Sequence, residues 1–321
     1  MPTDCGTAAF EVTAAAQHPF AVRLYPVRDY LALTKPEINF LIAIATFAGF
    51  YAGCPAHFHA FPFTLLIDTL LGTLLVASGA GTLNQYVERR FDRQMRRTAR
   101  RPLAGGRLDA SSVLWFGVLL SFAGIVILAV AVSALTSVLA ALTLASYLGL
   151  YTPLKRKTPL CTMVGALPGA MPPLIGWAAA SGTLSFEAWV LYAILFLWQF
   201  PHFMAIAWMY REDYARAGYL VLPRGEQAGR FMSWQALTAS LALIPVSLIP
   251  TAIGAAGFVY SVGACVLSCG LFRYSLRLTL RKSNAAARRL LMASIIYLPL
   301  TLLLMVLDKQ AWGRFGLTNM P

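Results

Sequence analysis

Charged residues are scarce in this chain of 321 residues. Asp, Glu, Lys and Arg make up 12% of it, 58% of the residues are hydrophobic, and the mean hydropathy is +0.65. A soluble globular domain has about 25% charged residues, so the composition excludes one. The chain is also too long for a single membrane anchor, and we predict an all-α, polytopic membrane protein.

Cysteine and intramembrane charge are scarce as well. The five cysteines are an odd number scattered mostly through apolar segments, which argues against a disulfide framework. Asp68 is the clearest acid inside an apolar run, so no pathway of paired intramembrane charges, typical of proton pumps and voltage sensors, is visible. Residues 1–29 lack a basic start followed by an apolar core, and no secretory signal is predicted.

Nine segments are long and apolar enough to cross a bilayer, which takes roughly 20 residues. We therefore predict a bundle of nine transmembrane helices forming one domain over residues 30–321, preceded by a mobile tail over residues 1–29. The predicted spans are 37–54, 63–83, 112–131, 134–151, 161–180, 186–207, 232–250, 252–272 and 289–307.

Lys and Arg lie almost entirely on one side of this bundle. All but two of the 26 fall before the first span or in loops on the same side. Positively charged loops stay in the cytoplasm, so the amino terminus and these loops are predicted to be cytoplasmic and the carboxyl terminus outside. Topology and anionic lipid headgroups account for the net charge of +13, and nucleic-acid binding is not expected.

The segment after the second span carries acids that topology does not require. In NQYVERRFDRQMRRTARR (residues 84–101), Asn84, Glu88 and Asp92 recur every four residues, which places them on one stripe of a helix. Amide and carboxylate oxygens suit Mg²⁺, which takes one or two protein carboxylates and completes its coordination with water and phosphate. Membrane topology is enough to explain any one of the arginines in this segment. The acids at four-residue spacing together with the arginines predict a site for magnesium and diphosphate.

Two further loops on the same side carry related groups. In MYREDYARAG, Glu212 and Asp213 could hold a second metal ion on the same diphosphate, although such a pair alone is more often a helix cap or a solvated turn. In YTPLKRKTP (residues 151–159), two prolines restrict a basic loop. Guanidinium and ammonium groups bind phosphate oxygens, and the predicted diphosphate ligands are Lys35, Arg93, Arg96, Arg97, Lys155, Arg156 and Arg211.

These stretches resemble the intramembrane aromatic prenyltransferase (UbiA-type) superfamily, and within it the protohaem IX farnesyltransferase family. The resemblance rests on six stretches in order, which together span residues 33–223. They are LTKPEI (33–38), NQYVERRFDRQMRRTARRPL (84–103), YTPLKRKTP (151–159), GALPGAMPPLIGWAA (165–179), QFPHF (199–203) and REDYARAGYLVLP (211–223).

The resemblance implies a nine-helix bundle with its diphosphate site at the cytoplasmic face of a bacterial inner membrane. It implies transfer of a farnesyl group from farnesyl diphosphate to a vinyl group of haem b, giving haem O for haem-copper terminal oxidases. Mg²⁺ would be the cofactor, and a haem A synthase or oxidase assembly factors would be partners. Asn84, Glu88, Asp92 and Asp213 would be catalytic, and His202 would contact haem, although a lone histidine in an apolar helix is more often structural.

Two positions depart from the superfamily pattern. Residue 88 is Glu where many relatives have Asp, and Asp213 is followed four residues later by Ala217 where other branches have a second Asp. The second departure argues against the branches that act on quinones and chlorophyll. A prenyltransferase with a quinone-type acceptor remains the alternative, followed by a transporter, which would leave the acidic stripe unexplained.

Overall fold

The computed structural model describes residues 27–54 and 61–310, and within these ranges the chain is helical and forms no β-strand. The helices are α1 (Val27–Leu33), α2 (Pro36–Gly53), α3 (Phe63–Asp92), α4 (Ala110–Ile127), α5 (Ala134–Ser146), α6 (Thr152–Leu154), α7 (Cys161–Gly169), α8 (Met171–Ser181), α9 (Phe186–Met209), α10 (Arg211–Arg216), α11 (Gln227–Ala252), α12 (Phe258–Arg281) and α13 (Asn284–Leu307). Two π-helical segments, η1 (Leu128–Val132) and η2 (Tyr147–Tyr151), continue α4 and α5. Most of the predicted tail, residues 1–26, lies outside the described residues.

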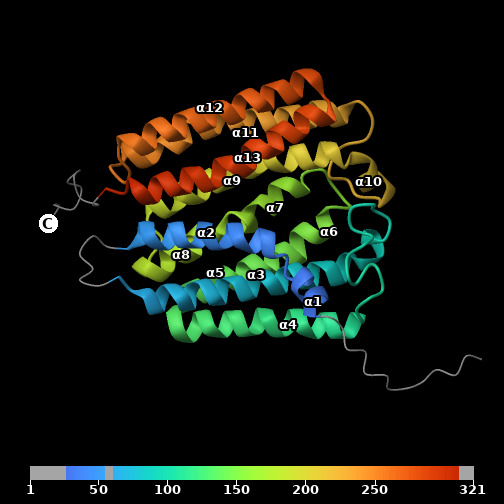
Figure 1. The fold of residues 1–321 in the computed structure, drawn as a ribbon, viewed down its shortest axis with the longest axis horizontal. Helices are drawn as coiled ribbons and strands as arrows, with labels where there is room; N and C mark the ends of the chain where they lie inside the picture. The colour runs from blue at the N-terminus through green and yellow to red at the C-terminus, as the bar shows by residue number, and fades with distance from the viewer. Residues whose placement is uncertain (1–26, 55–60, 311–321) are drawn as a thin grey trace, which may run out of the picture.

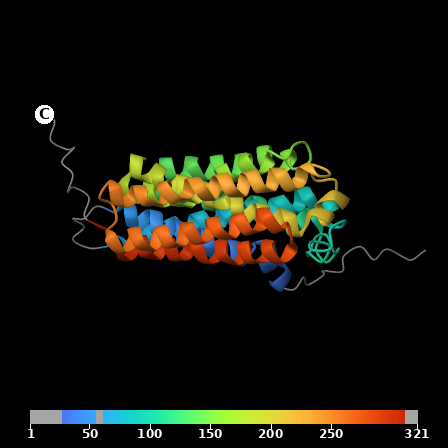
Figure 2. The ribbon, with the colours of Figure 1, turned by 90° about the horizontal axis from the view of Figure 1, so that it is seen from above.

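The predicted nine-span, all-α architecture is confirmed. Over the described ranges, eight helical stretches are long and apolar enough to cross a membrane, and α1 with α2, bent by 51°, forms a ninth candidate. The long helices run roughly parallel (Figures 1 and 2), and α1 and the end of α13 lie at opposite ends of the bundle. Opposite ends are what an odd number of crossings requires.

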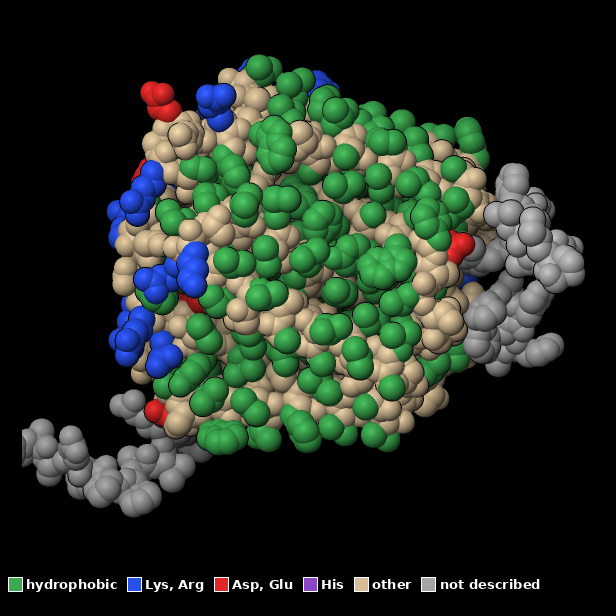
Figure 3. Space-filling model, turned by 180° about the vertical axis from the view of Figure 1, so that it is seen from behind, with side chains coloured by type: hydrophobic (Ala, Val, Ile, Leu, Met, Phe, Trp, Pro, Cys, Tyr) green, Lys and Arg blue, Asp and Glu red, His purple; other side chains and the backbone are tan. Residues whose placement is uncertain are grey.

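Several helices run past the predicted spans at one end of the bundle. The helix α3 continues to Asp92, α12 continues to Arg281, and α11 and α13 begin at Gln227 and Asn284. With its 30 residues, α3 is about 45 Å long, whereas the hydrocarbon core is about 30 Å thick. Lys and Arg gather at this end and an apolar surface covers the middle (Figure 3). Hydropathy detects only the apolar part, and the helices continue into the interface.

One predicted boundary is wrong. The eighth span was expected from residue 252, but residues 253–257 form a turn between α11 and α12. Gly254 has a φ of +74° there, and the carbonyl of Pro250 accepts hydrogen bonds from the N–H groups of Ala255 and Ala256. The turn residues are small or apolar, so their hydropathy does not distinguish them from the helices on either side.

The innermost spans are those around α8 and α9. About 61% of the most apolar window is buried in Cys161–Ser181 and in Phe186–Met209, against 28% in Ala110–Val132 and in Phe258–Arg281. Membrane helices associate through close packing and hydrogen bonds, because lipid is as apolar as their side chains. Gly176 illustrates this, since a Cβ there would collide with the carbonyl of Thr46 on α2. The outer helices α4 and α12 therefore face lipid.

Candidate active site

The end of α3 forms the centre of the site. Asn84, Glu88 and Asp92 all lie on this helix, and their exposed fractions are only 2%, 6% and 1%. Burying carboxylates costs free energy unless opposite charges and hydrogen-bond donors surround them. The partners come from the α3–α4 loop, which directly follows α3, and from two segments distant in the sequence, namely η2 with α6 and the loop after it, and α10 with the loop after it.

Glu88 pairs with the basic loop after α6. Its Oε1 accepts a hydrogen bond from Lys155 Nζ at 2.8 Å, and the same Nζ lies 4.5 Å from the centroid of the Tyr151 ring. Burial by itself would lower the pKa of Lys155, but Tyr151 and Glu88 together hold that pKa well above its ordinary value. Lys155 is therefore a permanent cation beside the acidic stripe.

Only one of the two carboxylate oxygens of Asp92 binds the α3–α4 loop. Oδ2 accepts from Arg101 Nη1 at 2.8 Å, and Thr98 Oγ1 donates to the Asp92 carbonyl at 2.9 Å. Oδ1 is buried and has no hydrogen-bond partner. Unpaired buried carboxylate oxygens are rare because they are costly, and Asp92 thus keeps one oxygen available for a ligand.

The π-helical segment η2 supports Asn84. The amide Nδ2 of Asn84 donates to Thr152 Oγ1 at 3.2 Å, and the Tyr147 hydroxyl lies 3.5 Å from its Oδ1. A π turn inserts one extra residue into a helix and is frequent at functional sites. Here η2 places Tyr147 beside Asn84 and Tyr151 beside Lys155.

The helix α10 completes the site through Asp213. This carboxylate accepts from the backbone N–H of Arg97 and from Arg216 Nη1, each at 3.3 Å. Beyond α10, the N–H of Leu220 donates to the carbonyl of Lys155 at 2.7 Å. The α10 region is thus joined directly both to the α3–α4 loop and to the basic loop.

Tyr219 is a site residue that the sequence analysis missed. It lies beside Glu88 and Asp92, and its hydroxyl is buried and forms no hydrogen bond of normal geometry. Burial and the charge of Glu88 raise the pKa of Tyr219 above its ordinary value, so it remains a protonated donor. No spacing rule connects Tyr219 to α3. It reaches the site through an edge-on contact with the Phe91 ring of α3, with centroids 5.8 Å apart, and through the hydrogen bond of Leu220 to Lys155.

Lys35 belongs to the same cluster. It sits at the bend between α1 and α2 with a φ of +53°, an unusual value for a residue other than glycine. Neighbouring contacts fix the bend, because Gln85 Nε2 donates to the carbonyl of Leu33 at 2.9 Å and Asn39 Nδ2 donates to that of Thr34 at 3.0 Å. Glu88, Arg101 and Lys155 lie within electrostatic reach of its ammonium group.

The other predicted phosphate ligands lie around this cluster or outside it. Arg97 stacks on Tyr210, with 5.1 Å between the guanidinium carbon and the ring centroid, and Arg156 stacks on Phe91 at 4.3 Å. Arg93 bonds the Ala104 carbonyl, and Arg96 is exposed. Arg211 binds Asn284 at the start of α13, and its ion-pair partner Glu212 has an 81% exposed side chain. Among the residues that the structure describes, Arg211 and Glu212 form no hydrogen bond or ion pair with the α3 cluster.

His202 lies within the bundle, on α9. Its Nδ1 is 2.9 Å from Ser294 Oγ on α13, and its ring stacks on Trp198 with centroids 5.1 Å apart. The Trp198 Nε1 also donates to the Ser294 carbonyl at 2.7 Å. One imidazole nitrogen is thus engaged with α13, which fixes the orientation of the ring.

The donor set fits a hard cation. No group of three His, Cys, Asp or Glu residues gathers as a metal cluster in residues 27–54 and 61–310. Mg²⁺ needs no such cluster, because it takes one or two protein carboxylates and obtains its other oxygens from water and phosphate. Asp92, with its unpaired Oδ1, Glu88 and the amide oxygen of Asn84 supply that kind of ligand.

Residues 42–297 match the model of the UbiA prenyltransferase family. The chain belongs to this family. It is 50% identical over 289 residues to the protoheme IX farnesyltransferase of Solibacter usitatus, an alignment that covers 88% of this chain and 99% of that one. It is 43% identical over 280 residues to the protoheme IX farnesyltransferase of Salinibacter ruber, covering 87% and 98% of the two chains.

Solved structures share the fold at low sequence identity. A digeranylgeranylglyceryl phosphate synthase superposes with a TM-score of 0.70 at 15% identity, covering 88% of this chain and 98% of that one. A UbiA homologue of Archaeoglobus fulgidus, bound to GPP and Mg²⁺, superposes with a TM-score of 0.53 at 14% identity, covering 86% and 99%. These likenesses establish that this chain has the helical architecture of its family.

Proposed function

We propose that this protein transfers the farnesyl group of farnesyl diphosphate to a vinyl group of haem b, giving haem O and diphosphate. The observation that carries the proposal is the buried set of oxygens on α3, enclosed by Lys155, Arg101 and the α10 region at one end of a membrane bundle. The relatives from Solibacter and Salinibacter, named protoheme IX farnesyltransferases, support the choice of substrates.

The charges of the site suit a diphosphate. Lys155 and Arg101 neutralise Glu88 and Asp92 at 2.8 Å each, and Lys35 lies within electrostatic reach. Asn84, Glu88 and Asp92 would hold Mg²⁺, with Asp213 at the edge of the site. When bound, Mg²⁺ supplies positive charge that stabilises the leaving diphosphate. A phosphate and metal pair could take over both ion pairs, with the cations turning to phosphate and the acids to metal.

The chain's own contribution is then binding and orientation of the two substrates and stabilisation of charge. The cationic side chains stabilise charge on the leaving oxygen as the bond to the allylic carbon breaks, and aromatic faces such as that of Tyr151 stabilise the cation-like carbon. The vinyl group forms the new carbon–carbon bond. Water then adds to the other vinyl carbon and loses a proton, which yields a hydroxyethylfarnesyl group. This route removes no ring proton, and no strong general base is needed.

We place the site on the cytoplasmic side of a bacterial inner membrane. The concentration of Lys and Arg at the end of the bundle that holds α10 supports this orientation. The haem O produced would pass to a terminal oxidase or to a haem A synthase. His202 is proposed to contact haem, and normal binding and conversion of haem by a His202→Ala protein would contradict this role.

The deciding experiment is mass analysis of haems extracted after the purified protein is incubated with haem b, farnesyl diphosphate and Mg²⁺. Hydroxyethylfarnesyl haem should appear, and EDTA should abolish it until Mg²⁺ is added back. Unmodified haem b from folded protein would contradict the proposal. The same incubation with a quinone precursor such as 4-hydroxybenzoate in place of haem then tests the alternative acceptor.

A further inference from the structure

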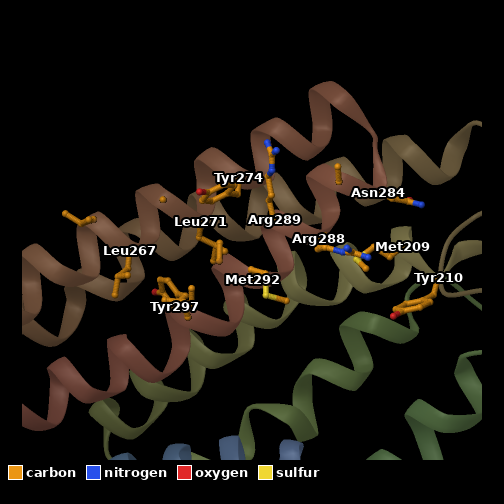
Figure 4. Close-up of a pocket in the computed structure, with 15 residues that line it drawn as sticks. Met209, Tyr210, Leu267, Leu271, Tyr274, Asn284, Arg288, Arg289, Met292 and Tyr297 are labelled. Atoms are coloured by element: carbon orange, nitrogen blue, oxygen red, sulfur yellow. The ribbon is translucent and has the colours of Figure 1, made fainter. Parts of the chain in front are cut away.

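A groove runs along the outer face of the bundle between α12 and α13, next to the end of α9. Its volume is about 920 Å³, within the range of roughly 300–1,000 Å³ that is usual for sites of small molecules and cofactors. Figure 4 shows its lining side chains along both helices, from Asn284 at one end to Leu267 and Tyr297 further along. The groove is separate from the contacts made by Glu88 and Asp92.

The walls of the groove are apolar and open toward lipid. Val266, Met292 and Ile296 line it and have exposed fractions of 65%, 50% and 56%. Leu271 and Tyr297 are only 1% exposed and form its floor. A lining with this exposure, on a helix that faces the bilayer, offers a surface for hydrocarbon chains.

One end of the groove carries uncompensated positive charge. Arg288 and Arg289 both line it and are exposed, and no acidic residue is among its lining residues. Neither guanidinium has an ion pair or a side-chain hydrogen bond within the part of the chain that the structure describes. The Oδ1 of the neighbouring Asn284 is held by Arg211 at 2.8 Å, which fixes the rim. Both guanidinium groups are therefore free to bind an anion that lies at this end of the groove.

Arg288 and Arg289 lie near the end of the bundle, at the level where lipid headgroups are expected. They lie in the second turn of α13, at the same end of the bundle as α10. From Arg289 to Ile296 the helix advances seven residues, or about 10 Å toward the bilayer centre. An amphiphile with a negative head at the arginines would therefore lay its tails along Met292, Ile296 and Val266.

We propose that this groove binds a phospholipid with an anionic headgroup, whose phosphate lies between Arg288 and Arg289 and whose acyl chains occupy the apolar walls. Basic pockets between membrane helices on the cytoplasmic side bind such lipids. The open, lipid-facing wall favours an occupant that enters sideways from the bilayer. The site is independent of the proposed reaction, because neither arginine takes part in the α3 cluster.

The test compares an Arg288→Gln/Arg289→Gln protein with a matched control, Arg273→Gln/Arg281→Gln. The control removes two exposed arginines of α12, at the same end of the bundle, that do not line the groove. Each purified protein is delipidated in detergent and titrated with phosphatidylglycerol or phosphatidylcholine, and bound lipid is counted by native mass spectrometry. A third protein, Ile296→Trp, fills the groove without changing its charge.

Wild type and control should bind phosphatidylglycerol in preference to phosphatidylcholine. The double variant should bind phosphatidylglycerol about 30-fold more weakly, since each arginine near an anionic lipid contributes roughly a fivefold factor, and Ile296→Trp should bind it more weakly as well. Equal binding by variant and control, or no preference for the anionic lipid, would overturn the proposal. So would displacement of the lipid by stoichiometric haem b, which would assign the groove to the acceptor.

Discussion

Both ends of the bundle contain charged side chains that are buried or half-buried, but the charges are satisfied differently at the two ends. At the end that holds α10, Glu88 and Asp92 are neutralised by side chains from loops, Lys155 and Arg101. At the opposite end, Lys309 Nζ donates to the carbonyls of Tyr51 and Cys54 at 2.7 and 2.8 Å. The neighbouring Asp308 accepts from the N–H of Tyr260 at 2.7 Å.

This difference separates the proposed binding site from a set of contacts that hold helix ends together. Side-chain ion pairs can be exchanged for a ligand without disturbing the backbone, and Asp92 Oδ1 has no partner to lose. The carbonyls that bind Lys309 end α2, and the N–H that binds Asp308 starts α12, so these contacts complete helix ends. Substitutions at the first end should lower activity, whereas substitutions at the second should lower stability.

The largest effect is expected for Asp92→Ala. The change removes the carboxylate with the unpaired oxygen and frees Arg101, and a lost electrostatic group of this kind lowers turnover by about 10³-fold. Haem O formation by purified protein measures it. Thermal unfolding should remain close to wild type, because the Arg101 side chain is 24% exposed and can be solvated once Asp92 is removed. An active Asp92→Ala protein would remove the central role given to α3.

Lys155→Met should lower both activity and stability, with a smaller loss of activity than Asp92→Ala. Turnover should fall by about 10²-fold, and unfolding should become easier by about 3 kcal/mol because Glu88 is left buried without its cation. The double variant Glu88→Gln/Lys155→Met should regain most of that stability and none of the activity, as thermal unfolding and the haem assay would show. If the double variant remained as unstable as the single one, Glu88 and Lys155 would not form an isolated pair.

The pH dependence of the Lys155 pair has a definite sign. The folded protein raises the pKa of Lys155 above its unfolded value of about 10.4. The stabilisation is therefore fully present below about pH 10 and is lost only as the pH rises through the higher folded value. Between pH 6 and 9, the stability difference between wild type and Glu88→Gln/Lys155→Met, in which neither partner can titrate, should stay constant, and a slope in that range would contradict the raised pKa.

At the opposite end, Lys309→Met should reduce stability and leave turnover unchanged. Two charge-assisted hydrogen bonds to carbonyls are lost, each contributing about 1.5–3 kcal/mol at most, and the methionine side chain retains some of the packing. A fall of a few degrees in the unfolding temperature is expected, with the rate of haem O formation unaltered below it. Reduced turnover in fully folded Lys309→Met protein would show that the two ends are coupled.

The sequence was sufficient to predict the membrane architecture and the shared helix face of Asn84, Glu88 and Asp92. Hydropathy locates spans because lipid demands continuous apolar helices, and four-residue spacing places Asn84, Glu88 and Asp92 on one face of any helix. The ion pairs could not be predicted in the same way. Which of many arginines reaches Asp92 depends on how the α3–α4 loop folds, and Arg101 is distinguished from Arg96 only by that geometry. Tyr219 has no periodic signal at all.

The smallest expected effects come from removing one hydroxyl oxygen at each of two tyrosines, one at the proposed site and one away from it. Tyr219→Phe removes a hydroxyl beside Glu88 and Asp92, and Tyr260→Phe removes one that donates to the Ser247 carbonyl at 2.8 Å. Loss of a hydrogen-bond donor to a ligand costs about 1 kcal/mol, which is roughly a fivefold change in a rate or binding constant. Tyr219→Phe should therefore lower kcat, or raise KM for farnesyl diphosphate, by that factor. The stability of the protein should not change. Tyr260→Phe should do the reverse, lowering the unfolding temperature with unchanged kinetics. Because the Tyr219 hydroxyl forms no hydrogen bond of normal geometry, a stability loss without a kinetic effect would show that Tyr219 is only a packing residue.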